Sequence, residues 1–335
     1  MTILVTGAAG FIGAHLCAAL SARGHRVIGC DHLRHDDPLL ALRRARVAAL
    51  LAPSGVHLVD ADLRDAHACE ALVAHGQPRV VVHLAARPGV RDSITDPLGY
   101  VGPNLVAFAN LLQSCSTQRV ARLLFASSSS VYGARSEAPF NEDDRCDRPE
   151  SFYAATKQAN EAMAHAFSRT RGLSVSALRF FTVYGPWGRP DMAYFSFAQR
   201  ICRAQPITLF AGGELWRDFT YIDDVVEAVC RLAERPGGPS WEVLNVGHSR
   251  PVQVRTFLAT LEAALGRRAQ ILDAPIQPGD VPMTCADPAR LHDAVGALPC
   301  TPLETGLQRF VAWLRVWQRS QPEVLPTATA QRVLA

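Results

Sequence analysis

The 335 residues are enough to bury one large core or two lobes that share a cleft. Hydrophobic residues make up 48% of the chain and charged residues 19%, as in ordinary globular proteins. The formal net charge is only +3, and lysines and arginines are scattered rather than gathered in runs, which argues against a nucleic-acid partner.

Cysteine usage and the absence of targeting signals bear on the compartment. Nine cysteines are spread singly, and no two have C-x-x-C spacing, which favours reduced thiols over disulfides or a metal site. The first residues resemble a buried strand that leads into a glycine turn, not a signal peptide. No apolar run reaches the roughly 18 residues that a membrane span requires. We therefore expect a cytoplasmic protein with neither a metal nor a membrane partner.

The first half of the chain alternates short apolar runs with amphipathic stretches. Strands are expected at Thr2–Thr6, Arg26–Cys30, Val56–Val59, Val80–His83, Arg122–Ser127 and Ser174–Arg179, and helices at Ile12–Arg23, Arg64–His75, Pro97–Cys115 and Tyr153–Arg171. This alternation, with nearly continuous apolar strands, predicts an α/β fold with a doubly wound parallel sheet of the Rossmann type.

After Arg179 the pattern changes, because prolines and glycines interrupt it as they do in loops and short elements that cover a site. Val243–Val246 again resembles a sheet strand, and a helix around Leu303–Trp317 closes the fold. We expect a Rossmann domain over residues 1–182 that also receives about 220–250. A smaller C-terminal substrate-binding lobe is expected from 183–219 and 251–320, followed by a disordered tail over 321–335.

A glycine turn follows the first strand and opens a helix. Its sequence is Thr6-Gly7-Ala8-Ala9-Gly10-Phe11-Ile12-Gly13. Gly7 permits the tight turn, Gly10 lets the backbone approach a pyrophosphate, and Gly13 lets helix and strand pack closely. The helix N-terminus offers unpaired N–H groups to the phosphates. A turn without a ligand would also use glycine, but this position favours a dinucleotide site.

The ends of the next strands carry further cofactor candidates. Asp31 ends the second strand, where a carboxylate accepts bonds from both adenosine ribose hydroxyls and repels a 2′-phosphate, which favours NAD over NADP. Asp62 and Leu63, after the third strand, are candidates for adenine contact. Small residues after the fourth strand would let the backbone pass beside the cofactor: Leu84, Ala85 and Ala86. Simple turn chemistry is the alternative for the last two groups.

Tyr153 and Lys157 lie one helical turn apart on one face of a predicted helix. A tyrosine with a pKa of about 10 is a poor base at neutral pH. A nearby ammonium and a positive nicotinamide ring would favour the phenolate. Upstream, Ser127–Ser130 follow a strand at the carboxyl edge of the sheet, where ligands bind. The alternatives are that Tyr153 and Lys157 are an ordinary exposed pair on a helix and that the serines form only a polar loop.

The glycine turn, Asp31, the serines and the Tyr–Lys helix occur in a single chain order. In this the sequence resembles the extended short-chain dehydrogenase/reductase family, along nearly its whole length, and within it the NAD-dependent sugar-nucleotide epimerases. Four blocks are similar to the UDP-glucuronate 4-epimerase group in particular: residues 86–93, 179–193, 218–224 and 277–281. The third block is widespread in the family, and residues 182–189 are the specific ones.

The resemblance implies a role for each matching residue. Tyr153 matches the base and Lys157 its electrostatic partner, and both also contact the cofactor. Ser128 and Ser130 match hydroxyls that share the proton, although the second position is usually threonine. Substrate positions are implied at Thr182 and Arg189 for the sugar carboxylate, at Arg217 for the diphosphate and at Asp280 for a ribose, with Arg91 and Ser129 as further contacts and Asn104 beside the cofactor.

Three positions bear on the branch of the family. Gln277 stands where galactose epimerases usually have arginine, which favours the uronate branch. Arg87 replaces the usual glutamine, and Gly102-Pro103 replaces the usual Asp-Ser before Asn104. The effects of these last two departures stay open.

The resemblance implies that UDP-glucuronate and UDP-galacturonate are interconverted through transient oxidation at C4 with bound NAD. A UDP-glucuronate decarboxylase would share the first step, and a neutral UDP-hexose 4-epimerase is the next alternative. A 4,6-dehydratase is disfavoured, because such enzymes typically have Asp-Glu where this chain has Ser129-Ser130. The Tyr–Lys pair disfavours a non-catalytic NAD-binding protein. By analogy, helices Pro97–Cys115 and Tyr153–Arg171 are expected to pair in a homodimer.

Overall fold

The structure is a computed structural model that describes residues 1–135, 137–277 and 279–320. The predicted disordered tail, 321–335, lies outside the described residues. Among those described, no helix is both long and apolar enough to cross a membrane.

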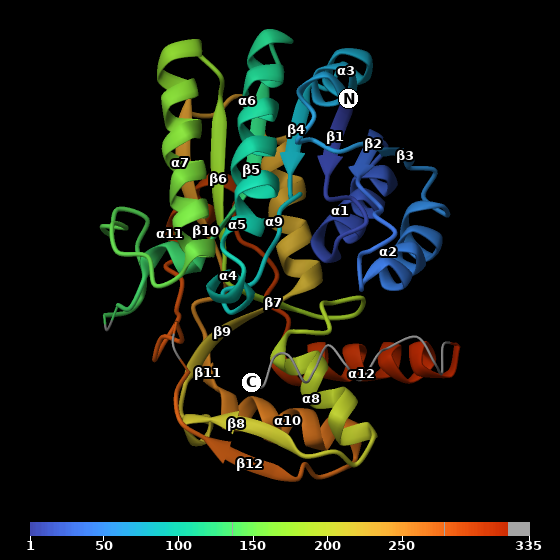
Figure 1. The fold of residues 1–335 in the computed structure, drawn as a ribbon, viewed down its shortest axis with the longest axis vertical. Coiled ribbons are helices and arrows are strands. Elements are labelled where there is room, and N and C mark those ends of the chain that lie inside the picture. Colours follow the sequence, from blue (N-terminus) through green and yellow to red (C-terminus); the bar gives the residue numbers. More distant parts are fainter. Residues whose placement is uncertain (136, 278, 321–335) are drawn as a thin grey trace.

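Seven parallel strands form the central sheet, in the order β10-β6-β5-β4-β1-β2-β3 (Figure 1). Their bounds are β1 (Thr2–Thr6), β2 (Arg26–Asp31), β3 (His57–Asp60), β4 (Val80–His83), β5 (Arg122–Ser128), β6 (Val175–Phe180) and β10 (Trp241–Val246). The strand order reverses between β1 and β4, which opens a crevice at their carboxyl ends. The predicted Rossmann-type sheet is confirmed, and each predicted strand is found with ends within two residues of the expected ones, β10 included.

Helices cover both faces of the sheet. On one face lie α3 (Ala66–Gly76), α6 (Ala107–Thr117) and α7 (Phe152–Arg171), and on the other α1 (Phe11–Ala22), α9 (Ile222–Glu234) and α11 (Ala289–Val295). Successive strand residues point to opposite faces, so Ile3 and Val5 enter the core under α1 and Leu4 the core under α3 and α6. This two-sided burial explains the nearly continuous apolar strands.

The predicted single helix over Pro97–Cys115 was wrong in one turn. The chain forms α4 (Asp92–Thr95), then α5 (Leu98–Val101), a π-helical turn at Gly102–Val106 and α6. Pro103 has no N–H to donate within a regular helix, and Ala107 N donates to Gly102 O across the widened turn. A further helix, α2 (Leu40–Arg46), and a second π-helical turn at Val47–Leu51 were not predicted.

The smaller lobe contains two short sheets and three helices, drawn below the main sheet in Figure 1. They are β7 (Thr182–Tyr184), β9 (Trp216–Tyr221) and β11 (Pro251–Gln253), then β8 (Ile207–Phe210) and β12 (Ile271–Ala274), with α8 (Ala193–Cys202), α10 (Val254–Leu265) and α12 (Leu303–Ser320). Buried aromatic rings such as Tyr184, Tyr194 and Phe310 belong to the same core as α1 and α9. Because the lobes share that core, the domain boundaries stay predictions.

A buried ion pair lies beneath the serine-rich end of β5. Arg179 on β6 donates to Glu161 on α7 through Nε at 3.0 Å and Nη2 at 2.8 Å. Ser127 Oγ donates to the same carboxylate at 2.5 Å. The Arg179 side chain is 5% exposed and that of Glu161 12%. The pair therefore fixes α7 against β5 and β6, where Tyr153 and Ser128 originate.

Replacing Arg179 by methionine leaves the Glu161 carboxylate buried without its cation. We expect Arg179→Met to lower the free energy of unfolding by about 3 kcal/mol, measured by urea denaturation. Arg268→Met is the matched control, because Arg268 pairs with Glu262 but its side chain is 86% exposed. The control should change the free energy by less than about 1 kcal/mol. Equal losses in the two variants would contradict the structural role of Arg179.

Candidate active site

The glycine turn leaves no space for side chains at its three glycines. Gly7 has φ +72°, and a Cβ there would lie 2.7 Å from Ala85 N. A Cβ on Gly10 or Gly13 would lie 2.8 or 2.1 Å from Gly7 O. No side chain caps the N-terminus of α1 at Gly10, so its first N–H groups face the crevice unshielded. A backbone cradle at a helix N-terminus fits a pyrophosphate, with Phe11 and Ile12 in the first turn.

Asp31 lies at the end of β2 and is joined to this turn. Its Oδ2 accepts Ala9 N at 2.8 Å, and its Oδ1 accepts His32 N and Arg43 Nη1, both at 2.8 Å. These bonds fill three of roughly four acceptor positions of a carboxylate. The sequence interpretation missed Arg43. The signal that could have identified it is the group of arginines that follows Asp31 in α2, the helix that was not predicted.

The other cofactor candidates also line the strand ends. A hydrogen bond from Arg64 holds the pKa of Asp62 below its usual value. Leu63 beside it is buried. The backbone after β4 is fixed to β1, since Ala85 N donates to Thr6 Oγ1 at 3.3 Å. Leu84, Ala85 and Ala86 therefore pass directly beside the glycine turn, as the predicted cofactor site requires.

Asn104 is 2% exposed and organises the loop after β4. Its Oδ1 accepts Arg87 N at 2.8 Å, and its Nδ2 donates to Arg87 O and to Thr156 Oγ1, both at 3.1 Å. Arg87 Nη1 lies 2.5 Å from Asp96 Oδ2, and its guanidinium lies 4.7 Å from the centre of the Tyr100 ring. Arg87, which stands where the family usually has glutamine, thus packs against α5, just before the π-helical turn.

The structure brings Tyr153, Lys157, Ser128 and Ser130 together where β5 ends and α7 begins. Lys157 Nζ donates to Ala126 O at 2.8 Å and lies 5.9 Å from the centre of the Tyr153 ring. Ser130 Oγ donates to Ser128 Oγ at 2.9 Å, and Ser128 lies close enough to the Tyr153 phenol to lower its pKa. The two serines therefore form a linked pair of hydroxyls beside the phenol.

Burial raises the pKa of Tyr153, while the positive charge of Arg189 and the hydrogen bond with Ser128 lower it. Burial also lowers the pKa of Lys157 to about 8, against the negative charge of Glu161. Tyr153 is therefore a neutral phenol at neutral pH in the cofactor-free chain. The predicted lowering of its pKa by the Lys157 ammonium and the nicotinamide ring together is not seen in the chain alone, where burial outweighs the nearby charges. The effect of the cofactor stays a prediction.

A tight turn directly precedes Arg189. Trp187 has φ +62°, and a Cβ on Gly188 would lie 1.6 Å from the Tyr194 hydroxyl oxygen. Arg189 Nε donates to Asp191 Oδ1 at 3.1 Å, and its Nη2 pairs with the other carboxylate oxygen. The charge of Arg189 lowers the pKa of Tyr153, and Tyr153 raises that of Arg189, so the two groups lie close enough to interact electrostatically.

Thr182 is the first residue of β7, separated from the end of β6 by Phe181 alone, and is half-buried. Ser129 begins a short 3₁₀ turn after β5 and is half-buried as well. The sequence interpretation placed both against the substrate. Both lie at strand ends, next to the linked serine hydroxyls or to the loop that carries Arg189.

A second group of predicted residues surrounds one carboxylate in the smaller lobe. Asp280 Oδ2 lies 3.3 Å from Arg91 Nη2, and its Oδ1 lies 3.8 Å from Arg217 Nη2. Arg217 also donates to Val281 O at 2.8 Å. Burial lowers the pKa of Arg217, with Asp280 raising and Arg91 lowering it. Two cations around one carboxylate leave net positive charge, which suits a diphosphate.

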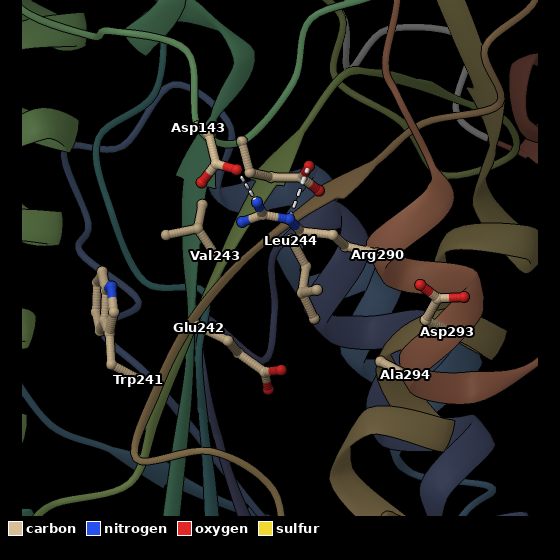
Figure 2. Close-up of a pocket in the computed structure, with 9 residues that line it drawn as sticks. Asp143, Trp241, Glu242, Val243, Leu244, Arg290, Asp293 and Ala294 are labelled. Atoms are coloured by element: carbon tan, nitrogen blue, oxygen red, sulfur yellow. Dashed lines mark hydrogen bonds and ion pairs between the residues drawn. The ribbon is translucent and has the colours of Figure 1, made fainter.

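A cavity of about 550 Å³ at the outer edge of β10 contains none of the predicted site residues. Figure 2 shows Arg290 directed at Asp143 there. Arg290 Nε also lies 3.8 Å from the buried carboxylate of Glu142. The cluster holds α11 against the sheet edge and is structural. The described residues contain no group of three or more His, Cys, Asp or Glu that could hold a metal.

The geometry can be compared with known proteins. Residues 3–247 match the model of the NAD dependent epimerase/dehydratase family. The chain belongs to this family. Its predicted cofactor, NAD, agrees with the family description.

Relatives within the family share most of the chain. A probable UDP-glucuronate 4-epimerase of Rhizobium meliloti (strain 1021) is 41% identical over 93% of this chain and 96% of its own. UDP-glucuronate 4-epimerase 4 of Arabidopsis thaliana is 43% identical over 93% of this chain and 75% of its own. The UDP-glucuronic acid 4-epimerase of Bacillus cereus, in complex with UDP-glucuronic acid and NAD, has a TM-score of 0.88 and 33% identity. That alignment covers 95% of this chain and 100% of the other.

Removing the charge of Arg189 should raise the pKa of Tyr153, because that charge favours the phenolate. With UDP-glucuronate, the substrate that the sequence implies, we expect Arg189→Met to move the ascending limb of kcat/KM to higher pH, by on the order of one unit. Arg189→Lys keeps the positive charge but loses the planar guanidinium fork, and it should leave the ascending limb of the pH profile where it is. An active Arg189→Met enzyme with an unshifted limb would refute this coupling.

Proposed function

We propose that this member of the epimerase/dehydratase family is an NAD-dependent UDP-glucuronate 4-epimerase that interconverts UDP-glucuronate and UDP-galacturonate. The observation that carries the proposal is Arg189, a carboxylate-binding fork whose charge acts on the candidate base Tyr153. The names of the relatives from Rhizobium meliloti and Bacillus cereus support it.

The residues present fit both ligands. The glycine cradle and Asp31 would hold the pyrophosphate and adenosine ribose of NAD, and Lys157 would reach the nicotinamide ribose. Arg217 and Arg91 would bind the UDP diphosphate, and Asp280 a ribose hydroxyl. The two arginines would then turn from Asp280 to the diphosphate, and the Asp280 carboxylate would accept a hydrogen bond from the ribose hydroxyl instead.

In the proposed reaction, Tyr153 as phenolate takes the proton of the C4 hydroxyl while Ser128 and Ser130 hold that hydroxyl through their own linked hydroxyls. Bound NAD supplies the chemistry of accepting a hydride from C4 and returning it to the opposite face. Between oxidation and reduction, the 4-keto sugar ring would rotate in the site and present its other face, while Arg217 and Arg91 keep its nucleotide bound. Tyr153 then returns the proton, so the chain ends as it began.

The 4-keto uronate is a β-keto acid, which loses CO₂ when its carboxylate bond aligns with the ketone π system. A 4-epimerase must therefore restrain the carboxylate. Arg189 would provide the guanidinium fork for this carboxylate, in exchange for its present pairing with Asp191, and Thr182 would provide a hydroxyl at the neighbouring strand. This restraint separates the proposed activity from a decarboxylase, and a carboxylate-binding arginine is not needed by a neutral UDP-hexose 4-epimerase.

We also propose that the protein works in the cytoplasm as a homodimer. All nine cysteines are free thiols, which suits a reducing compartment. α6 and α7 lie side by side on one face of the sheet (Figure 1). Val106, which directly precedes α6, is 43% exposed, and Ala162 and Ala166, one turn apart on α7, are exposed as well. Exposed apolar side chains on α7 and at the start of α6 favour a four-helix interface.

The proposed function is tested by incubating the purified protein with UDP-glucuronate and separating the nucleotide sugars by chromatography and mass. We expect a product of unchanged mass that co-elutes with UDP-galacturonate. Tyr153→Phe should lower turnover by roughly 10² to 10⁴, because it removes the base. Binding of NAD and UDP-glucuronate, measured by calorimetry, should stay nearly unchanged in that variant.

Other outcomes would point to the rival activities. Loss of CO₂ as the main reaction of the unmodified protein would identify a decarboxylase. Turnover of UDP-glucose or UDP-galactose alone would identify a neutral-sugar epimerase. Undiminished turnover in Tyr153→Phe would overturn the mechanism, whichever substrate is used.

The homodimer predicts a mutational signature in light scattering. The double variant Val106→Asp/Ala162→Asp should shift the protein from dimer to monomer, because it buries charge in the proposed interface. Leu272→Asp is the control, since Leu272 is 56% exposed on β12 of the smaller lobe and should leave the dimer intact. A monomeric unmodified protein would remove the homodimer proposal.

A further inference from the structure

Arg46, the last residue of α2, is a buried arginine that no part of the proposed reaction uses. It is 2% exposed. Its Nε donates to Trp187 O at 2.8 Å, its Nη2 to Gly188 O at 2.9 Å and its Nη1 to Ala9 O at 3.2 Å. All three acceptors are backbone carbonyls, which do not neutralise its charge. Burial accordingly lowers the pKa of Arg46 to about 10. Burying a cation in this way is costly.

The carbonyls belong to two loops that are distant in the sequence. Ala9 lies in the glycine turn, and its N–H donates to Asp31 Oδ2. Trp187 and Gly188 directly precede Arg189. One guanidinium therefore joins the cradle for the pyrophosphate to the loop that carries the carboxylate fork.

The loop before Arg189 depends on such support. Trp187 has φ +62°, a conformation that L residues other than glycine, asparagine and aspartate rarely adopt. Its ring packs on α12, with ring centres 5.1 Å from Trp313 and 5.2 Å from Trp317. That packing fixes the side chain, while Arg46 fixes the carbonyls of two successive peptides, Trp187–Gly188 and Gly188–Arg189. Without Arg46, the carbonyls lose all three donors of this side chain at once.

We propose that Arg46 is a positioning residue that aligns the Arg189 loop with the cofactor turn and thereby keeps the substrate carboxylate out of line with the ketone. The proposal rests on the proposed function, which it deepens. If Arg189 moves, the C5–C6 bond of the 4-keto uronate can align with the ketone. That bond then breaks, its electron pair forms the C4–C5 enolate, CO₂ leaves and C5 takes a proton from water. The products are a UDP-4-keto-pentose, CO₂ and the reduced cofactor.

The decisive variants are Arg46→Met and Arg46→Lys. Methionine removes all three donors while keeping an unbranched side chain, and lysine keeps the charge but not the planar fork. Arg122→Met is the matched control. Arg122 is also buried, at 5% exposed, and its Nη1 donates to Leu232 O at 3.0 Å and Arg235 O at 3.3 Å. It begins β5, at the end of the sheet opposite the crevice.

Each holoenzyme is incubated with UDP-glucuronate, and the ratio of UDP-4-keto-pentose to UDP-galacturonate is measured by mass. We expect Arg46→Met to raise this ratio roughly tenfold to a hundredfold, because small displacements of positioning groups have effects of that size. Arg46→Lys should raise it less. The bound NAD per subunit after desalting should fall in Arg46→Met, since Ala9 loses its anchor. Arg122→Met should match the unmodified protein in both measurements, even if its melting temperature falls.

An unchanged ratio in Arg46→Met, or an equal rise in Arg122→Met, would overturn the proposal. If Arg46→Met does not fold, Arg46→Lys decides. The three donors of an ammonium lie on one nitrogen and cannot reproduce the spacing of the three guanidinium nitrogens that now hold the carbonyls, so an unchanged ratio contradicts the positioning role. If the unmodified protein does not act on UDP-glucuronate, the proposed function fails separately. NAD retention then decides, and equal retention in Arg46→Met and Arg122→Met overturns the inference.

Discussion

The close packing of the glycine turn against the end of β4 constrains everything else at the crevice. Gly7 approaches Ala85 so closely that a Cβ would lie 2.7 Å from its amide nitrogen, and Gly13 is confined in the same way by Gly7 O. The N-terminus of α1 therefore meets the strand ends directly, without side chains between them. Asp31 and Arg46 both bond to Ala9 within this turn. A displacement of the turn would therefore move both Asp31 and, through Arg46, the loop that carries Arg189.

The second half of the site is placed by the shared hydrophobic core. Tyr184, Tyr194 and Phe310 of the smaller lobe belong to the core that also covers the sheet beneath α1 and α9. Since interiors are close-packed, this continuity resists independent movement of the two lobes. The loop with Arg189 is thus fixed from three directions: by β7, by α12 and by Arg46. A carboxylate restraint requires this rigidity, because the competing loss of CO₂ depends only on a bond rotation.

Most of the fold and the chemistry-bearing residues could be predicted from local patterns. Tyr153 and Lys157 share a helix face by spacing alone, and Ser128 follows an apolar strand whose end has to lie at the crevice. The π turn at Gly102–Val106 could not be predicted, because only the packing around Pro103 decides between kink and widened turn. Arg46 was missed for a different reason. Its partners are carbonyls of Ala9, Trp187 and Gly188, and backbone acceptors leave no signal in a sequence.

Arg189 has two electrostatic effects that oppose each other during the proposed reaction. In the free chain its charge favours the Tyr153 phenolate against the effect of burial. A substrate carboxylate bound to Arg189 neutralises that charge, so the base loses this support when the substrate arrives. Lys157, whose pKa is about 8, stays beside the Tyr153 ring, and bound NAD would add the positive charge of its oxidised nicotinamide. We expect these two charges to favour the phenolate in the ternary complex in place of Arg189. The cofactor's part of this support would be absent when its ring is neutral, so that Tyr153 would then keep its proton.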